Sequence, residues 1–365
     1  MSVLEQSKVS AFEVFDVKKA SKKILSFYEN EAVSIDCNIN LAQDLNQIQS
    51  ITLKNAQLKV SILTLGASIQ SVYLNGHEHS LVLGSPRLAD YLQGAKYFGA
   101  VVGRVANRTN EGHAVIDGKT YQLPPTLPEA HHLHGGPDGT GSKNWSIIEQ
   151  TDDMVQLQTK LADGEMGYPG NMTVDVFYRL LDSTLEMEIT ATTDKLTICN
   201  FAGHSYVNLD GTGSILDHQL SIQADHYLPV DAGLIPTGEV TPTAGSAFDF
   251  LKMRTIGHED YPELDTNFCL SLASHRPLQT VATLKAPITG LTLHYQTTEP
   301  GLQVYDGRHI QLSAEANINH GALSAYAGLA LEAQQWPDAI NQPHFPAILL
   351  APEETYRQIT RYVFG

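Results

Sequence analysis

Several long segments of the chain alternate apolar and polar residues, which is the pattern of strands that bury one face of a sheet. The clearest segment runs from Thr184 to Thr193. Its apolar face carries Leu185, Met187, Ile189 and Ala191, and its polar face carries Glu186, Glu188 and Thr190. Strands of this kind are typical of antiparallel sheets with one face on the core.

Turn signals separate these segments at short spacing. Three turns are predicted, each beside strand-like runs: Asp117-Gly118 between 113–116 and 119–123, Asn75-Gly76 between 68–74 and a run ending at Leu83, and 288–291. Asn-Gly and Asp-Gly are the dipeptides that tight hairpins favour.

After residue 50 no segment of ten residues or more has a convincing helical period, so a βαβ nucleotide-binding fold is not expected. Many short strands without a linker predict one all-β domain over residues 49–365, a large antiparallel β-sandwich or barrel-like body. Residues 1–48 are rich in Lys, Glu and Asn, and some helix fits 14–29. We treat 1–48 as an N-terminal extension of unknown role.

Composition narrows the class of partner and the compartment. The formal charge of −17 repels nucleic acids and anionic membranes, so neither is expected as a partner. The three cysteines, Cys37, Cys199 and Cys269, are too few and too scattered for a disulfide framework. Neither a secretion signal nor a run long enough to span a membrane is found. We therefore expect a cytoplasmic protein, as a monomer or a homodimer.

The stretch 328–339 places a carboxylate on an otherwise apolar strand. Alternation turns Leu329, Leu331 and Ala333 to one face and Ala330, Glu332 and Gln334 to the other. Among apolar neighbours the pKa of Glu332 would rise, which suits a general base. The alternative is an ordinary solvent-facing glutamate.

A second candidate group lies in the segment 199–208. If this segment is extended, His204, Tyr206 and Asn208 share one face, and Ser205 lies on the other. A histidine between hydrogen-bonding neighbours can hold a proton or keep one tautomer, although a structural histidine is the alternative. Together with Glu332 it could supply an acid and a base on two sides of a bound molecule, across a gap the size of a sugar ring.

Other polar residues interrupt the pattern in irregular stretches. Asn107 and Arg108 could donate hydrogen bonds to hydroxyl groups of a ligand, whereas Arg104 suits a structural salt bridge. Asp265 and Gln303 suit a polyol, or are simply turn or edge residues. Tyr168 lies in a loop at 163–170 and could pack on the apolar face of a sugar.

Three neighbouring histidines, His131, His132 and His134, raise the possibility of a metal site. No further ligand at a recognisable spacing accompanies them, so a histidine that hydrogen-bonds a substrate is at least as good an explanation. The Gly-x-Ser-x-Gly elbow of serine hydrolases is missing, and so is a phosphate-binding glycine loop with a lysine.

Taken in order, eight motifs closely resemble the aldose 1-epimerase family: YFGAVVGRVANR, HLHGG, DGEMGYPG, GHSYVNL, LDTNF, GLQVYDG, LEAQQWPDA and NQPHFP. The resemblance begins near Ile51 and reaches the C-terminus. It implies a large antiparallel β-sandwich of the galactose mutarotase type with a sugar cleft and no cofactor.

Position by position, the resemblance implies that His204 is the catalytic acid and Glu332 the catalytic base. The sugar contacts that it implies fall on Asn107, Arg108, His134, Ser205, Tyr206, Asp265 and Gln303. No metal ligand is implied. Thr266, Val207 and Asp306 depart from the usual family pattern, which bears on sugar preference more than on the chemistry.

The expected activity is the interconversion of the α and β anomers of a free aldose such as galactose or glucose. His204, charged at the start, would protonate the ring oxygen while Glu332 takes the proton of the C1 hydroxyl. Two alternatives stay open: a sugar-binding or sugar-sensing protein without catalysis on the same fold, and an epimerase of a disaccharide such as maltose.

Overall fold

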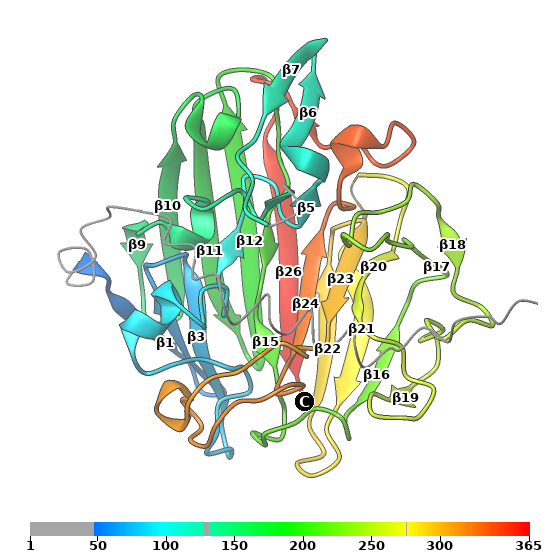
Figure 1. Ribbon diagram of the computed structural model, residues 1–365. Coiled ribbons are helices and arrows are strands. Elements are labelled where there is room, and N and C mark those ends of the chain that lie inside the picture. Colours follow the sequence, from blue (N-terminus) through cyan, green and yellow to red (C-terminus); the bar gives the residue numbers. More distant parts are fainter. Residues whose placement is uncertain (1–46, 128–130, 275) are drawn as a thin grey trace, which may run out of the picture. The chain divides into compact units, whose positions relative to one another are not determined.

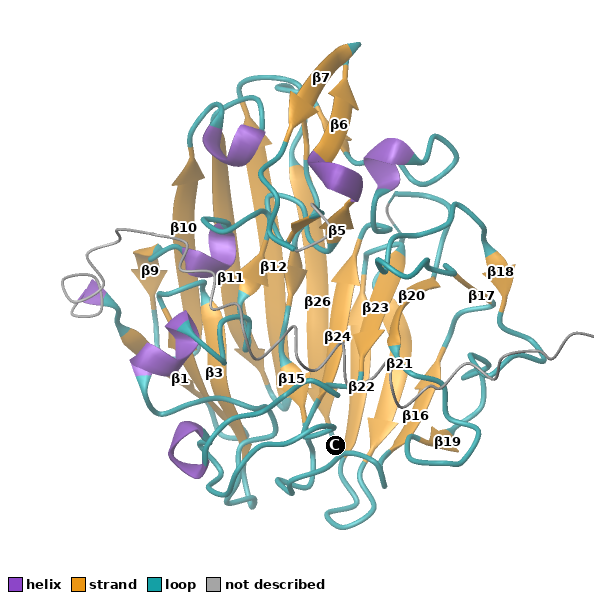
Figure 2. Ribbon diagram, in the orientation of Figure 1, coloured by secondary structure: helices purple, strands orange, loops and turns teal. Residues whose placement is uncertain are grey.

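The computed structural model describes residues 47–127, 131–274 and 276–365 (Figure 1). The helix expected at 14–29, Cys37 and nearly all of the expected N-terminal extension lie outside these residues. The described residues form antiparallel sheets joined by loops and short 3-10 turns, without an α-helix (Figure 2). The predicted all-β fold class is therefore confirmed.

The larger of the two main sheets has nine strands. In spatial order these are β19 (Arg254–Thr255), β16 (Gln219–Ile222), β21 (Gln279–Lys285), β22 (Thr292–Thr297), β26 (Tyr356–Phe364), β12 (Thr184–Thr193), β11 (Met172–Leu181), β10 (Met154–Leu161) and β9 (Ser146–Gln150). The strand at Thr184–Thr193 has the bounds that alternation predicts. Its residues Leu185, Met187 and Ile189 are buried in the core, as expected for a sheet with one apolar face.

The second main sheet has six strands and carries the polar residues of interest. Its order is β15 (Tyr206–Val207), β24 (Leu329–Gln334), β23 (Gly301–Tyr305), β20 (Asp265–Cys269), β17 (His226–Tyr227) and β18 (Thr241–Pro242). Figure 1 shows β24, β23 and β20 side by side. Residues of both main sheets contribute to one hydrophobic core, and the hydroxyl of Tyr295 in β22 donates to the carbonyl of Leu331 in β24 over 2.7 Å.

Smaller elements complete the described part of the chain. A three-stranded sheet contains β1 (Ser50–Lys54), β2 (Leu58–Leu63) and β3 (Ser68–Leu74). Strand pairs are β4 (Val101–Val102) with β14 (Ala202–Gly203), β5 (Arg108–Thr109) with β8 (His132–Leu133), β6 (His113–Ile116) with β7 (Lys119–Gln122), and β13 (Thr197–Ile198) with β25 (Leu349–Leu350). The 3-10 turns are η2 (Leu88–Leu92), η3 (Asn110–Gly112), η4 (Thr140–Ser142), η5 (Glu165–Gly167), η6 (Ala314–Ala316) and η7 (Ala339–Asn341).

Two of the three predicted turns join paired strands. The turn at Asp117-Gly118 joins β6 to β7, and the turn at 288–291 joins β21 to β22. The prediction at Asn75-Gly76 is wrong in its second strand, because the run ending at Leu83 forms only an isolated bridge from Val82 to Val207. Within the described ranges, no helix is long and apolar enough to cross a membrane.

Candidate active site

Strand register gathers polar side chains on one face of β20, β23 and β24. Gln303 in β23 lies opposite Glu332 in β24 and opposite Asn267 in β20. Asp265 and Tyr305 form the next pair along the same face, because the side-chain period of a strand is two. The intervening residues Leu331 and Val304 are in the core. Alternation therefore predicts the orientation of Glu332 correctly.

His204 lies between β14 and β15, at the edge of this face. Its backbone N–H donates to the carbonyl of Ala100 over 2.9 Å, and its carbonyl accepts from the N–H of Gly99 over 3.0 Å. The next strand, β15, pairs with β24 through Tyr206 and Ala330. These contacts bring Nε2 of His204 to 3.5 Å from Oε1 of Glu332. The expected pair is thus formed, but the sugar-sized gap between its members is not.

Burial moves the pKa values of the pair in opposite directions. The Glu332 side chain is 3% exposed, and burial, with the negative charge of Asp265, raises its pKa to about 8 against the smaller opposing effect of Arg108. Burial lowers the pKa of His204 to about 4. At neutral pH the pair therefore carries one proton, which resides on Glu332. The imidazolium expected at the start of ring opening therefore has to take its proton from Glu332, across the 3.5 Å contact.

His134 and Asn107 are locked together beside this pair. The backbone N–H of Asn107 donates to Nδ1 of His134 over 3.1 Å, and the N–H of His134 donates to the carbonyl of Asn107 over 3.1 Å. Both residues have positive φ angles, 63° and 51°, a conformation that clusters at functional sites. Since Nδ1 accepts a hydrogen bond, the ring proton resides on Nε2. Burial, followed by the charges of His204, Arg108 and Lys96, lowers the pKa of His134, so it stays a neutral donor.

Arg108, Asp265 and Gln303 form a polar group on the β20 side. The Nε2 atom of Gln303 donates to Oδ1 of Asp265 over 2.6 Å, and a guanidinium nitrogen of Arg108 lies 3.5 Å from Oδ2 of Asp265. Nε of Arg108 is buried without a partner. The group is held together by its own contacts and keeps hydrogen-bonding capacity for a ligand.

Tyr97 is a part of the site that the sequence analysis did not assign. Its ring stacks on His204 with centroids 5.8 Å apart and an interplanar angle of 21°, and its centroid lies 4.9 Å from that of His134. Tyr206 contacts the His204 ring at 5.1 Å. Two tyrosine rings therefore fix the imidazole of His204. In the sequence, the signal for this role is that Tyr97 is the aromatic residue that opens the Gly-rich motif YFGAVVGRVANR.

Comparison with known proteins identifies the family of this arrangement. The sequence profile described as aldose 1-epimerase matches residues 49–363. The chain belongs to the aldose 1-epimerase family.

Similar proteins cover most of the chain. Galactose mutarotase of Mus musculus is 39% identical over 327 residues, which are 87% of this chain and 94% of the mouse protein. Aldose 1-epimerase of Escherichia coli (strain K12) is 33% identical over 339 residues, 89% of this chain and 97% of the bacterial one.

Solved structures share the fold. An aldose epimerase homologue from C. elegans has a TM-score of 0.81 and 29% identity, covering 87% of this chain and 99% of its own. Galactose 1-epimerase from Lactobacillus acidophilus has a TM-score of 0.75 at 29% identity, covering 87% of this chain and 94% of its own. These comparisons confirm the β-sandwich of the aldose 1-epimerase family.

One residue implied by the family pattern lies away from the polar face. Ser205 alternates with His204 and Tyr206, and its side chain lies beside the Tyr362 hydroxyl in the core. The sugar contact that the family pattern implies for Ser205 therefore stays a prediction.

The three departures from the family pattern are also away from that face. Thr266 follows Asp265 in β20, so its side chain points to the opposite face of the sheet. Val207 belongs to the core. The carboxylate of Asp306 accepts hydrogen bonds from Nε of Arg308 and from the N–H of Leu264. None of the three therefore projects beside Glu332.

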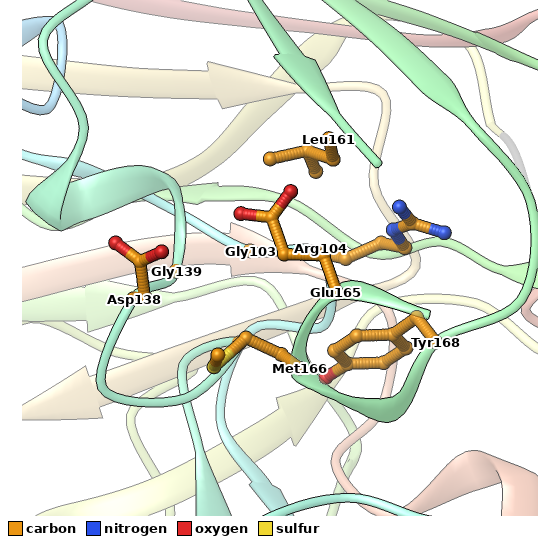
Figure 3. Close-up of a pocket in the computed structure, with 9 residues that line it drawn as sticks. Gly103, Arg104, Asp138, Gly139, Leu161, Glu165, Met166 and Tyr168 are labelled. Atoms are coloured by element: carbon orange, nitrogen blue, oxygen red, sulfur yellow. The ribbon is translucent and has the colours of Figure 1, made fainter. Parts of the chain in front are cut away.

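The loop aromatic Tyr168 is buried rather than sugar-facing. Its hydroxyl lies 2.7 Å from Nε2 of His132, and the Arg104 guanidinium carbon lies 5.4 Å from the centre of its ring. Figure 3 shows Tyr168 with Arg104, Glu165 and Met166 around a small pocket whose lining contains none of the expected site residues. Arg104 donates to the carbonyls of Pro169 and Gly170, so its role is structural, through carbonyls and not through a salt bridge.

The three neighbouring histidines do not combine into a metal site. Nδ1 of His131 accepts from the N–H of Glu111, and both ring nitrogens of His132 have partners. His134 instead joins His204 and Glu332, with one ligand atom of each within 4.8 Å of the others. A metal-bound histidine needs a free lone pair and a proton on its other nitrogen. Since Nδ1 of His134 already accepts a hydrogen bond, Nε2 keeps its proton, and the group fits a hydrogen-bond donor better than a metal ligand.

Proposed function

We propose that the protein is an aldose 1-epimerase, an isomerase that interconverts the anomers of a free aldose. The observation that carries the proposal is the buried contact of 3.5 Å between His204 and Glu332. Mutarotation acts on two oxygens bonded to the same carbon, the C1 hydroxyl and the ring oxygen. An acid and a base that lie side by side can reach both, so a wider gap between them is unnecessary.

Ring opening needs two proton transfers. Glu332, as carboxylate, removes the proton of the C1 hydroxyl; the C1 carbonyl forms, the bond from C1 to the ring oxygen breaks, and His204, as imidazolium, protonates that oxygen. Rotation about the bond between C1 and C2 presents the other face of the carbonyl, and closure reverses both transfers. The pair ends with the same single proton.

The protonation state that burial favours in the His204–Glu332 pair matches one stage of this cycle. After ring opening the carboxyl group of Glu332 is protonated and His204 is neutral. The pKa directions favour the same state in the free protein, because burial disfavours both charged forms. The carboxylate and imidazolium that open the ring arise by transfer of one proton over the 3.5 Å contact.

The neighbouring polar groups would hold the rest of the sugar. Arg108, Asp265 and Gln303 supply charged and amide partners on one side of Glu332. The Nε2 proton of His134 would bond an oxygen at the reacting end. Tyr206 packs against His204, and Asn107 hydrogen-bonds to His134. These two residues therefore affect the sugar indirectly, by positioning the two histidines.

Galactose is the first substrate to test, because similar proteins are named galactose mutarotase. Polarimetry of freshly dissolved α-galactose, α-glucose, a pentose and maltose, one at a time, measures acceleration over the spontaneous rate. We expect acceleration for at least one monosaccharide. Sugar binding without acceleration of any of them would instead show a binding protein on this fold.

The compartment and assembly are also proposals. Cys199 and Cys269 are free and buried, as suits a reducing compartment such as the cytoplasm. A monomer or a homodimer is proposed for assembly, and 49–365 as one catalytic domain. Sedimentation of the full chain distinguishes the two assemblies.

A further inference from the structure

Asn267 and Gln334 lie on the polar face of the six-stranded sheet, next to Gln303 and Glu332. Asn267 is the cross-strand neighbour of Gln303, and Gln334 follows Glu332 by two residues on the same face of β24. Both residues are buried: Asn267 is 2% exposed and Gln334 is 0% exposed.

All four polar atoms of these amides lack hydrogen-bond partners. They are Oδ1 and Nδ2 of Asn267 and Oε1 and Nε2 of Gln334. Buried amides in folded proteins are nearly always paired. The same unpaired state is found at Nδ1 of His204 and Oε2 of Glu332. Unpaired atoms therefore gather on this face of the sheet, which indicates groups that gain partners when a ligand binds.

Gly301 leaves room for the Asn267 amide on this face. Its position in β23 lies opposite Gln334 and opposite Cys269, and β23 places no side chain there. A Cβ atom at Gly301 would lie only 2.7 Å from Oδ1 of Asn267 and 3.0 Å from the carbonyl oxygen of Gln334. The Asn267 amide thus occupies the space that any other residue at 301 would fill.

We propose that Asn267 and Gln334 are sugar-binding residues that help to determine which aldoses bind. The proposal rests on the proposed function and deepens it. An amide has both donors and an acceptor, and a hydroxyl group is likewise a donor and an acceptor. Because Asp265 and Arg108 lie toward the other end of this face, Asn267 and Gln334 bind hydroxyl groups that those two residues do not hold.

The test uses near-isosteric apolar variants, Asn267→Leu and Gln334→Met. Neither amide has a hydrogen-bond partner within the protein, so we expect an unchanged or higher melting temperature. We expect the KM for the aldose to rise about 3- to 10-fold in each variant, with kcat little changed, because each loses a hydrogen bond to the sugar.

Gln335→Met is the matched control. Nε2 of Gln335 donates to Glu299 and to the carbonyl of Ser274, so the NH2 group of this amide is paired within the protein, unlike those of Asn267 and Gln334. The control variant should melt at a lower temperature and keep the wild-type KM. The proposal and the control thus predict opposite patterns for neighbouring glutamines.

Deoxy analogues of the preferred sugar identify the hydroxyl that is bound. In the wild-type protein, removing the bound hydroxyl from the sugar should raise the KM. In the variant that has lost the amide binding this hydroxyl, the same deoxy analogue should have the same KM as the parent sugar. An unchanged KM, or a lowered melting temperature with equal loss for every analogue, would show that the amides are structural and overturn the inference. If the wild type accelerates no mutarotation, the proposed function fails, and calorimetry of sugar binding with the same variants still tests the inference.

Discussion

His204 and Glu332 are buried side by side, and burial lowers the pKa of the one while it raises the pKa of the other. The values of about 4 and about 8 enclose neutral pH. Between them the pair carries one proton, whichever of the two residues holds it. The anomeric reaction needs this single proton, because one oxygen loses a proton as the other gains one.

The pH dependence of kcat/KM should therefore be bell-shaped. Below about pH 4 His204 is also protonated, so the pair carries two protons. Above about pH 8 Glu332 is deprotonated, so the pair carries none. Activity falls in both directions. Polarimetry across pH 3.5 to 9.5, with the spontaneous rate subtracted at each pH, measures both limbs. A rate independent of pH over this window would contradict the assignment.

Charged neighbours should move the alkaline limb in opposite directions. The negative charge of Asp265 raises the pKa of Glu332, so Asp265→Asn should shift this limb to lower pH. The positive charge of Arg108 lowers the same pKa, so Arg108→Met should shift the limb to higher pH. Both variants should also bind sugar more weakly. Equal shifts of the same sign would refute the electrostatic account.

Tyr97 should act by packing against the His204 ring and excluding water from it. Tyr97→Phe retains the stacked ring and should keep near-normal kcat. Tyr97→Ala removes it, so we expect kcat to fall about tenfold, a magnitude typical of lost positioning. Added solvent should also raise the pKa of His204 and move the acid limb to higher pH. An acid limb that stays in place in Tyr97→Ala would argue against this role.

Tyr168 should affect stability and not catalysis. Tyr168→Phe leaves Nε2 of His132 buried without its partner, which should reduce the free energy of unfolding by about 1–3 kcal/mol. The KM for the sugar should be unchanged. Urea denaturation and polarimetry of the same preparation provide the two measurements. A raised KM with normal stability would restore the sugar-facing interpretation of the loop.

Strand alternation was enough to predict the fold class and the orientation of Glu332. The period of two places Leu331 in the core and Glu332 on the opposite face, and the structure has the same arrangement. Alternation also placed Ser205 on the opposite face from His204, and in the structure its side chain lies beside the Tyr362 hydroxyl. Register across strands was not predictable, because it depends on pairings such as Gln303 with both Glu332 and Asn267.

Protonation and burial were beyond sequence reasoning for a physical reason. The charge of His204 depends on how completely Tyr97, Tyr206 and the backbone around Ala100 exclude water, and these contacts come from distant segments. Likewise, the polarity of the Tyr168 loop did not reveal that Arg104 and His132 bury its ring. The expected boundary between the extension and the domain at residue 48 stays a prediction.

The most direct test compares Glu332→Gln with the wild-type protein. The substitution keeps the shape of a side chain that the buried site already favours in its uncharged form, but it cannot take up the C1 hydroxyl proton. Polarimetry of fresh α-galactose should show kcat lower by a factor of about 10² to 10⁴, with sugar binding by calorimetry largely retained. Near-normal mutarotation by Glu332→Gln would contradict the account.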